Sequence, residues 1–175
     1  MTGTSGEQIR IRSFRREDLA ACRQLYSEGL LGGRLAENDT GLDIDDIDQA
    51  YMKTEGNHFW VAEIPGVSDG RPPEVVGMIG VQQFREGVGE IRRLRVRGDV
   101  RRRGIGTQLV EQALKFCQER SYLKMTLDTF MEREPAIRLF EKFHFHHDRT
   151  RNVAGKELMY FYLDLYSSDR PRAEG

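Results

Sequence analysis

Residues 101–107, with the sequence RRRGIGT, leave the chain few ways to pass from one secondary-structure element to the next. They separate a run of strand character at 90–96 from a run of helical character at 107–120. The two glycines predict a turn that leads directly into the helix. The first N–H groups of a helix have no partner within it and carry partial positive charge. With three arginines beside them, these groups predict a binding site for a phosphate or diphosphate.

The spacing of apolar residues predicts the element order β-α-α-β-β-β-α-β-α-β-β. Strands are expected at 9–12, 59–64, 75–84, 90–96, 123–127 and 159–165, and helices at 17–30, 43–54, 107–120 and from Pro135 onward. At 175 residues the chain has the length of one domain with a core of its own. We expect that domain at 8–166, with short flexible tails at 1–7 and 167–175.

Three kinds of phosphate-binding turn are compatible with two glycines before a helix. A dinucleotide fold needs G-x-G-x-x-G, but Leu109 occupies the third glycine position, although Asp128 lies at a suitable distance for a ribose contact. A nucleotide-triphosphate loop needs a lysine before Thr107, and none is present. The remaining kind is the acyl-coenzyme A diphosphate turn, R/Q-x-x-G-x-G/A.

Three segments in the same order resemble the GNAT superfamily of acyl-CoA-dependent N-acetyltransferases. Residues 90–96 (EIRRLRV) are similar to the fourth strand of that family, and 101–106 (RRRGIG) match its diphosphate motif in full. Residues 136–145 (AIRLFEKFHF) resemble its A-x-x-L-Y-E-x-x-G-F segment. The resemblance covers about 9–165 and implies an α/β fold of the α+β type. Its central sheet would be mixed and mostly antiparallel, with helices on both faces and a splay between the fourth and fifth strands.

The same resemblance implies acetyl-CoA as co-substrate. Unpaired backbone groups in the splay would bond the pantetheine arm as an added strand would, and would steady the thioester oxygen. The implied cofactor-binding residues are Leu94, Arg95 and Val96 on the strand, and Arg101, Arg102, Arg103, Gly104, Ile105, Gly106 and Thr107 at the turn.

Glu90 is the candidate catalytic residue, because many family members carry a glutamate on this strand. An amine attacks only when it is neutral, so a carboxylate could accept its proton through a water molecule. The alternative is that Glu90 forms a structural ion pair with Arg92 or another arginine of the sheet.

The chain departs from the family pattern at three positions. Phe140 replaces a tyrosine proposed in relatives to protonate the leaving thiolate, so another group or water serves, or the thiolate leaves unaided. Arg133 replaces a common asparagine. His144 replaces a common glycine, which would alter the turn into the next strand.

Charge patterns bear on the partners. Seven arginines fall between Arg92 and Arg103, but without aromatic stacking residues they favour a solvated strand face and a phosphate site over nucleic-acid binding. The acidic residues at 37–48 either attract a cationic substrate or form a solvated helix start; in the first case Asp45 and Asp46 would set the KM. No metal site is expected, because the spacing of His144, His146 and His147 fits no zinc pattern.

The predicted function is direct transfer of an acetyl group from acetyl-CoA to a primary amine of a small molecule, an amino acid or a peptide. The alternatives are a non-catalytic acyl-CoA sensor and a dinucleotide-binding enzyme. A net charge of −1 and the absence of long apolar runs predict no nucleic-acid and no membrane partner. Two separate cysteines and no secretory signal predict a cytoplasmic protein, as a monomer or homodimer.

Overall fold

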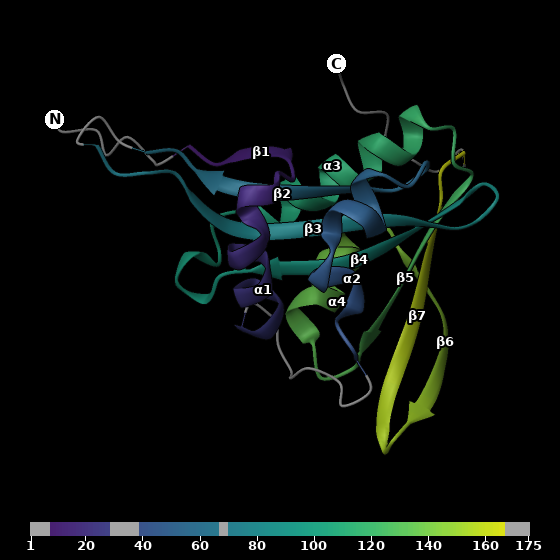
Figure 1. The fold of residues 1–175 in the computed structure, drawn as a ribbon. Helices are drawn as coiled ribbons and strands as arrows, with labels where there is room; N and C mark the ends of the chain where they lie inside the picture. The colour runs from purple at the N-terminus through teal and green to yellow at the C-terminus, as the bar shows by residue number, and fades with distance from the viewer. Residues whose placement is uncertain (1–7, 29–38, 67–69, 167–175) are drawn as a thin grey trace, which may run out of the picture.

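The structure, a computed structural model, describes residues 8–28, 39–66 and 70–166. They form a seven-stranded sheet with the strand order β1-β2-β3-β4-β5-β7-β6 (Figure 1). The strands are β1 (Arg10–Ser13), β2 (His58–Ile64), β3 (Glu74–Arg85), β4 (Val88–Val96), β5 (Lys124–Phe130), β6 (His146–Val153) and β7 (Lys156–Asp164). Neighbouring strands are antiparallel, except that β4 and β5 are parallel. The predicted mixed, mostly antiparallel sheet is confirmed, and the parallel sheet of a dinucleotide fold is excluded.

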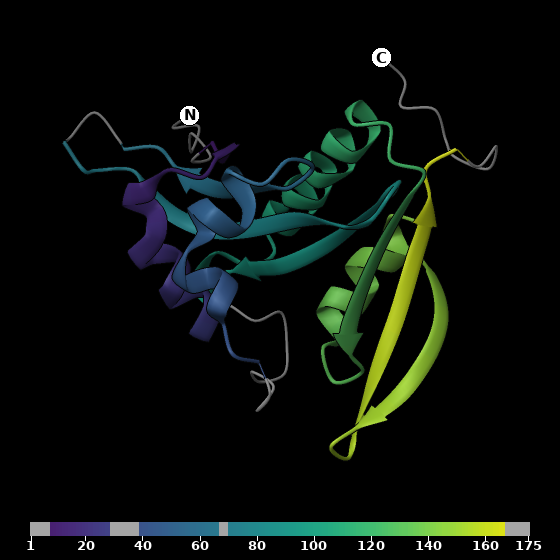
Figure 2. The same ribbon diagram turned by 45° about the vertical axis from the view of Figure 1, so that its right-hand side comes forward.

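Helices cover both faces of this sheet, as predicted. They are α1 (Leu19–Glu28), α2 (Leu42–Asp45), α3 (Ile105–Glu119) and α4 (Glu134–Lys142), with short helical turns at Arg16–Asp18, Asp48–Met52 and Gly98–Val100. Figure 2 shows α1 and α2 on one side of β2–β4 and α3 on the other. Each face therefore has its own apolar core.

The larger core joins the sheet to α3 and α4, through residues such as Ile79, Leu109 and Phe140. The smaller core joins the opposite face to α1 and to the segment around α2, through Cys22 and Tyr51. The face of β3 toward the smaller core is packed so closely that a Cβ at Gly80 would lie 2.7 Å from the Tyr51 ring. No side chain fits there, which explains the glycine inside the strand.

The sheet opens between β4 and β5. The two strands pair only at their starts, where Val88, Gly89 and Glu90 lie opposite Lys124, Met125 and Thr126. Beyond Glu90 both strands continue without pairing to each other, since β4 runs to Val96 and β5 to Phe130. The predicted splay between the fourth and fifth strands is therefore confirmed, and it lies at the carboxyl ends of the two parallel strands.

Element boundaries differ modestly from the predictions. The helix α3 begins at Ile105, two residues earlier than predicted, and β5 extends to Phe130 rather than ending at residue 127. The predicted element order includes a strand before the last one, but its residues could not be given from the sequence. This strand, β6, is exposed along nearly its whole length and so lacks apolar alternation. The expected tails, 1–7 and 167–175, lie outside the described residues.

Candidate active site

A cleft of about 570 Å³ occupies the splay between β4 and β5. Its walls come from both sheet faces: residues 39–43 before and within α2 on one side, and α4 with its preceding loop on the other. The second halves of β4 and β5 form its two edges, and the β6–β7 hairpin contributes Val153 and Leu158. The cleft is therefore bordered by elements that cover both faces of the sheet.

A bulge in β4 shapes one edge of this cleft. The pairing with β3 shifts between Met78 opposite Arg95 and Gly80 opposite Arg92, which leaves Arg93 and Leu94 opposite a single residue. Arg93 takes a left-handed conformation, with φ of 58°, which is uncommon for a residue with a side chain. The extra residue bends the strand away from β5 and changes which backbone groups face the gap.

Backbone groups of Leu94 and Val96 face the gap. The N–H of Arg97 donates to the Val76 carbonyl on β3, and backbone groups of successive strand residues point to alternate sides. The backbone N–H and C=O groups of Val96, and those of Leu94 two residues earlier, thus point away from β3. Their carbonyls accept side-chain bonds instead of sheet bonds, from Arg95 Nη1 at 3.0 Å and from Arg101 Nε at 3.3 Å. Both residues were predicted from the sequence to line a cofactor.

The glycine turn ends where α3 begins, with Gly104 as the residue before the helix. Gly104 has φ of 77°, a conformation that favours glycine, and no side chain caps the first N–H groups of α3. A Cβ at Gly106 would lie 3.1 Å from Leu139 Cδ2, so this glycine lets α4 pack against the start of α3. The uncapped N–H groups fit a diphosphate, as the sequence predicts.

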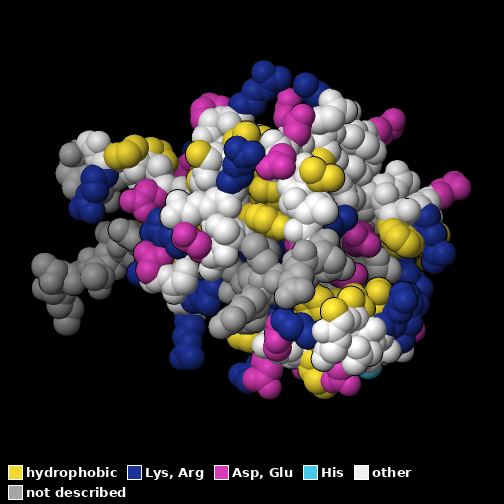
Figure 3. Space-filling view, turned by 60° about the horizontal axis from the view of Figure 1, so that its bottom comes forward, with side chains coloured by type: hydrophobic (Ala, Val, Ile, Leu, Met, Phe, Trp, Pro, Cys, Tyr) yellow, Lys and Arg dark blue, Asp and Glu magenta, His cyan; other side chains and the backbone are white. Residues whose placement is uncertain are grey.

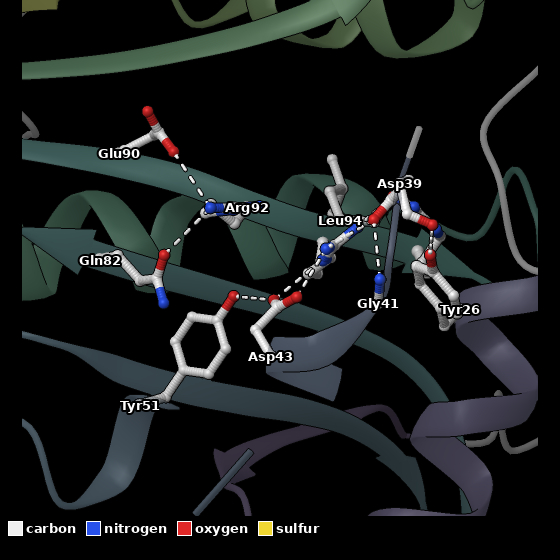
Figure 4. Close-up of polar contacts among 11 residues, drawn as sticks. Tyr26, Asp39, Gly41, Asp43, Tyr51, Gln82, Glu90, Arg92 and Leu94 are labelled. Carbon is white, nitrogen blue, oxygen red and sulfur yellow. Dashed lines mark hydrogen bonds and ion pairs between the residues drawn. The ribbon is translucent and has the colours of Figure 1, made fainter. Parts of the chain in front are cut away.

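Glu90 lies on β4 at the point where the strands separate, and Figure 4 shows it beside Arg92. A Glu90 Oε1 lies 3.7 Å from Arg92 Nη1, so an ion pair with Arg92 is present, as one interpretation expected. The side chain is 27% exposed. Burial, together with the negative charge of Asp128, raises the pKa of Glu90 above its usual value, although Arg92 opposes the shift. A carboxylate with a raised pKa is suited to accept a proton near neutral pH.

Asp128 lies across the gap on β5 and also lines the cleft. Burial of the Asp128 carboxylate raises its pKa above the usual value, although the positive charges of Arg92 and Arg133 oppose the shift. Asp128 makes no hydrogen bond or ion pair with the residues that the structure describes. The sequence suggested it only as a ribose contact of a dinucleotide fold, a role that the sheet topology excludes.

Arg93, the bulged residue, is held by two carboxylates of the neighbouring wall, those of Asp39 and Asp43. Figure 4 labels both acids. Its Nη2 lies 2.6 Å from Asp43 Oδ1 and 3.0 Å from Asp39 Oδ1, and Nε lies 2.9 Å from Asp43 Oδ2. Tyr51 donates its hydroxyl to the same Asp43 carboxylate at 2.6 Å. Burial would raise the pKa of Asp39, but the hydrogen bonds and charge of Arg93 outweigh it and lower that pKa to about 2.

The same balance holds at Asp43. Burial favours its neutral form, but the hydrogen bonds from Arg93 and Tyr51 keep its pKa below the usual value. The two acids and the arginine therefore form a buried ionic cluster that fixes the strand at its bulge.

Two charge predictions are corrected by this cluster. The arginines of β4 do not form a solvated face, because the side chain of Arg93 is 8% exposed and Arg95 is 6% exposed as a residue. The acidic block is not simply a solvated helix start either, since Asp39 and Asp43 enter the cleft. Asp45, which one of the two alternatives expected to attract substrate, pairs with Arg23 on the exposed surface. The sequence signal was the acidic block itself, but it did not show which acids turn inward.

The three departures from the family pattern have different outcomes. Phe140 is buried beside the cleft, and its ring meets Phe145 edge to face at 5.6 Å. His144 adopts φ of 67°, so the turn keeps the left-handed conformation despite the missing glycine. Arg133 lines the cleft and lies over the Phe130 ring, 5.3 Å from its centre.

Acidic and basic side chains are interspersed on the face in Figure 3. Within 8–28, 39–66 and 70–166, no three His, Cys, Asp or Glu side chains are grouped to hold a metal ion. No described helix has the length and apolar character needed to cross a membrane.

Comparison with known proteins places this arrangement in context. Residues 19–145 match the model of the acetyltransferase (GNAT) family. The chain is 33% identical over 110 residues to a probable N-acetyltransferase camello of Xenopus tropicalis, covering 62% of this chain and 47% of that protein. It is 31% identical over 130 residues to the N-acetylaspartate synthetase of Homo sapiens, covering 74% and 40%. The chain thus spans less than half the length of these curated relatives.

Solved structures share the fold. One is yncA, a putative acetyltransferase from Salmonella typhimurium with its cofactor acetyl-CoA, at a TM-score of 0.74 and 20% identity, over 95% of this chain and 99% of that one. Another is Arabidopsis thaliana NAA60 in complex with a bisubstrate analogue, at 0.71 and 18%, over 90% and 98%. At these identities the likeness concerns the fold.

Proposed function

The chain belongs to the acetyltransferase (GNAT) family, and we propose that it transfers an acetyl group from acetyl-CoA to a primary amine of a small molecule, an amino acid or a peptide. One observation carries the proposal. We call the point after Glu90 where β4 and β5 separate the fork. The gap-facing backbone of Leu94 and Val96 leads from the fork toward the uncapped start of α3 at Gly104. An extended thioester with a diphosphate at its far end requires such a path.

Each part of the site has a role in this proposal. Acetyl-CoA supplies the thioester carbonyl carbon that the amine nitrogen attacks. The N–H of Leu94 donates a hydrogen bond to the carbonyl oxygen as its negative charge grows. Glu90, through a water molecule, accepts the proton that the amine loses. The C–S bond breaks as the N–C bond forms, and the thiolate leaves without a proton from Phe140, which has none to give.

The amine enters from the α1–α2 side, where Glu90 and Asp128 lie. The co-substrate lies on the α3–α4 side, where the helix start binds its diphosphate. Both ligands therefore reach the gap at the same time, and the acetyl group passes directly between them. The relatives named N-acetyltransferase and N-acetylaspartate synthetase support an amine as acceptor.

The test is turnover. Purified protein is incubated with acetyl-CoA and a panel of primary amines, and free thiol release and acetylated products are measured. We expect amine-dependent thiol release, together with a product whose mass is increased by one acetyl group. Binding of acetyl-CoA by calorimetry, with no product from any amine, would contradict the enzymatic proposal.

That result would favour a second candidate, a sensor that binds acetyl-CoA without transferring the acetyl group. The observation behind it is Phe140, which places an apolar ring where relatives have a proton donor. A Phe140→Tyr variant distinguishes the two. In an enzyme whose thiolate leaves unaided the added hydroxyl changes the rate by only a few-fold, whereas a sensor stays inactive with either residue.

A further inference from the structure

Arg95 is a buried cation whose hydrogen bonds are incomplete. The residue is 6% exposed and lines the cleft from β4, directly after the bulge. Its Nη1 donates to the carbonyl of Leu94 at 3.0 Å, and its guanidinium lies 5.9 Å from the centre of the Tyr26 ring. Its Nε has no acceptor among the residues that the structure describes. Burying a charge is unfavourable unless it is paired, so the site fits an anion that comes from outside the chain.

The residues around Arg95 do not supply the missing anion. Asp39 and Asp43, the acids nearest the bulge, are already bonded to Arg93. Burial first, then the positive charges of Arg133 and Arg93, lower the pKa of Arg95 to about 10, which still leaves the guanidinium charged at neutral pH. Arg133 lines the same cleft. Among the described residues, Arg95 therefore has no ion-pair partner of its own and lies near two other cations.

The opposite part of the cleft is acidic. Glu90 and Asp128 lie where β4 and β5 separate, and the negative charge of Asp128 is felt at Glu90. The cleft thus has a negative end at the fork and a positive end beyond the bulge. A molecule with an ammonium group and a carboxylate matches both ends at once.

Resting on the proposed function, we infer that the acceptor is a free amino acid, whose carboxylate binds Arg95 while its amine lies toward Glu90 and Asp128. A plain amine or a polyamine would leave Arg95 without a counter-charge. A peptide amino terminus has an amide where the free amino acid has its carboxylate, so it lacks the anion next to the amine.

The anion belongs to the acceptor rather than to coenzyme A. The side chain of Arg95 lies near Tyr26 of α1, on the sheet face that α1 and α2 cover. The start of α3, which fits the diphosphate, packs on the opposite face. The two positive sites are therefore separated by the sheet and serve different molecules.

The experiment compares amino acids with their α-carboxamides, which have nearly the same size. The wild-type kcat/KM for thiol release is measured for each pair at one pH. We expect the amino acid to be preferred by at least about tenfold, mainly through KM, because the carboxamide leaves the guanidinium unpaired. Amine basicity alone favours the carboxamide, since a larger share of it is neutral, so the expected preference cannot come from basicity.

Variants then assign the preference to one residue. Arg95→Met is expected to abolish it, and Arg95→Lys to retain part of it, because lysine keeps the charge but not the planar fork. Arg97→Met is the matched control, since Arg97 pairs with Asp99 and Glu74 on the surface, and the preference should persist there. Calorimetry with coenzyme A and thermal unfolding show whether each variant is folded and still binds the co-substrate.

The outcomes separate the two proposals. If wild type acetylates amino acids and carboxamides equally well, or if a folded Arg95→Met keeps the preference, the inference about the acceptor is wrong and the acetyltransferase proposal stands. A preference for peptides with a free amino terminus likewise overturns the inference alone. If coenzyme A binds but neither these pairs nor any other primary amine of the panel is acetylated, the proposed function fails and the inference with it.

Discussion

The guanidinium of Arg93 and the carboxylate of Asp43 form a two-pronged ion pair, at 2.6 and 2.9 Å, across 50 residues of sequence. Arg93 is also the residue whose left-handed backbone makes the bulge in β4. The pair therefore ties α2, which contains Asp43, to β4 beside the cleft, and it offsets the unfavourable conformation of Arg93.

Removing one acid from this pair is expected to be costly. Asp43→Asn leaves the buried Arg93 partly unpaired and weakens the bond from Tyr51, so we expect a loss of about 3–5 kcal/mol in the free energy of unfolding. Asp45→Asn is the control, because Asp45 and Arg23 form an exposed pair worth less than about 1 kcal/mol. Urea unfolding of both variants measures the difference. Equal midpoints for the two variants would show that the cluster contributes little.

The same cluster predicts the response to acid. The pKa of Asp39 is lowered to about 2 in the folded protein, so its ion pair stabilises the fold fully above the unfolded pKa of an aspartate, about 3.9. That contribution is lost as the pH falls from about 4 through 2, because the unfolded chain then binds more protons. Urea unfolding between pH 5 and 2 should show a smaller pH dependence in Asp39→Asn than in wild type. An unchanged slope would contradict the assigned pKa.

Glu90→Gln removes the proposed proton acceptor. We expect kcat to fall by roughly 10²–10⁴-fold, with coenzyme A affinity unchanged. In wild type, kcat/KM should fall as the pH drops through the raised pKa of Glu90, since only the carboxylate accepts a proton. Glu86→Gln, an exposed position before β4, should behave as wild type. Full turnover by Glu90→Gln at neutral pH would leave Glu90 with its structural role beside Arg92.

Asp128→Asn tests the electrostatic link across the fork. The charge of Asp128 raises the pKa of Glu90, so its removal should move the acidic limb of the kcat/KM profile to lower pH. A purely structural role for Asp128 would lower the rate at every pH without moving the limb. The full pH profile of the variant distinguishes the two results.

Gly106→Val tests the diphosphate site. Its side chain would press on Leu139 and spread over the first N–H groups of α3, so the Kd for coenzyme A should rise by about tenfold or more. Gly98→Val is the control, because a Cβ there has nothing within 4 Å. Calorimetric titration of both proteins gives the comparison, and matching affinities would place the diphosphate elsewhere.

The sequence predicted the parts of this protein that depend on local pattern. The strand–turn–helix unit around Gly104, the splay after Glu90 and the helices on both faces agree with the structure. These features follow from periodicity, from turn chemistry and from the family resemblance.

The sequence could not predict features that depend on contacts between distant segments. Arginines on a strand have the same pattern whether they are solvated or buried, so the bonds from Arg93 to Asp39 and Asp43 were missed. Asp128 lay one residue beyond the predicted end of its strand, and its position across the gap from Glu90 depends on which strands are neighbours. The ends of strand β6 could not be predicted, because neither of its faces is buried and it shows no apolar pattern.

The opening between β4 and β5 is bordered by helices of both sheet faces. In the proposed reaction each of the two reactants thus approaches from its own side of the sheet, and neither must depart before the other arrives. Initial velocities measured against one reactant at several fixed levels of the other should give intersecting double-reciprocal lines, the signature of a ternary complex, instead of the parallel lines of an acetylated intermediate.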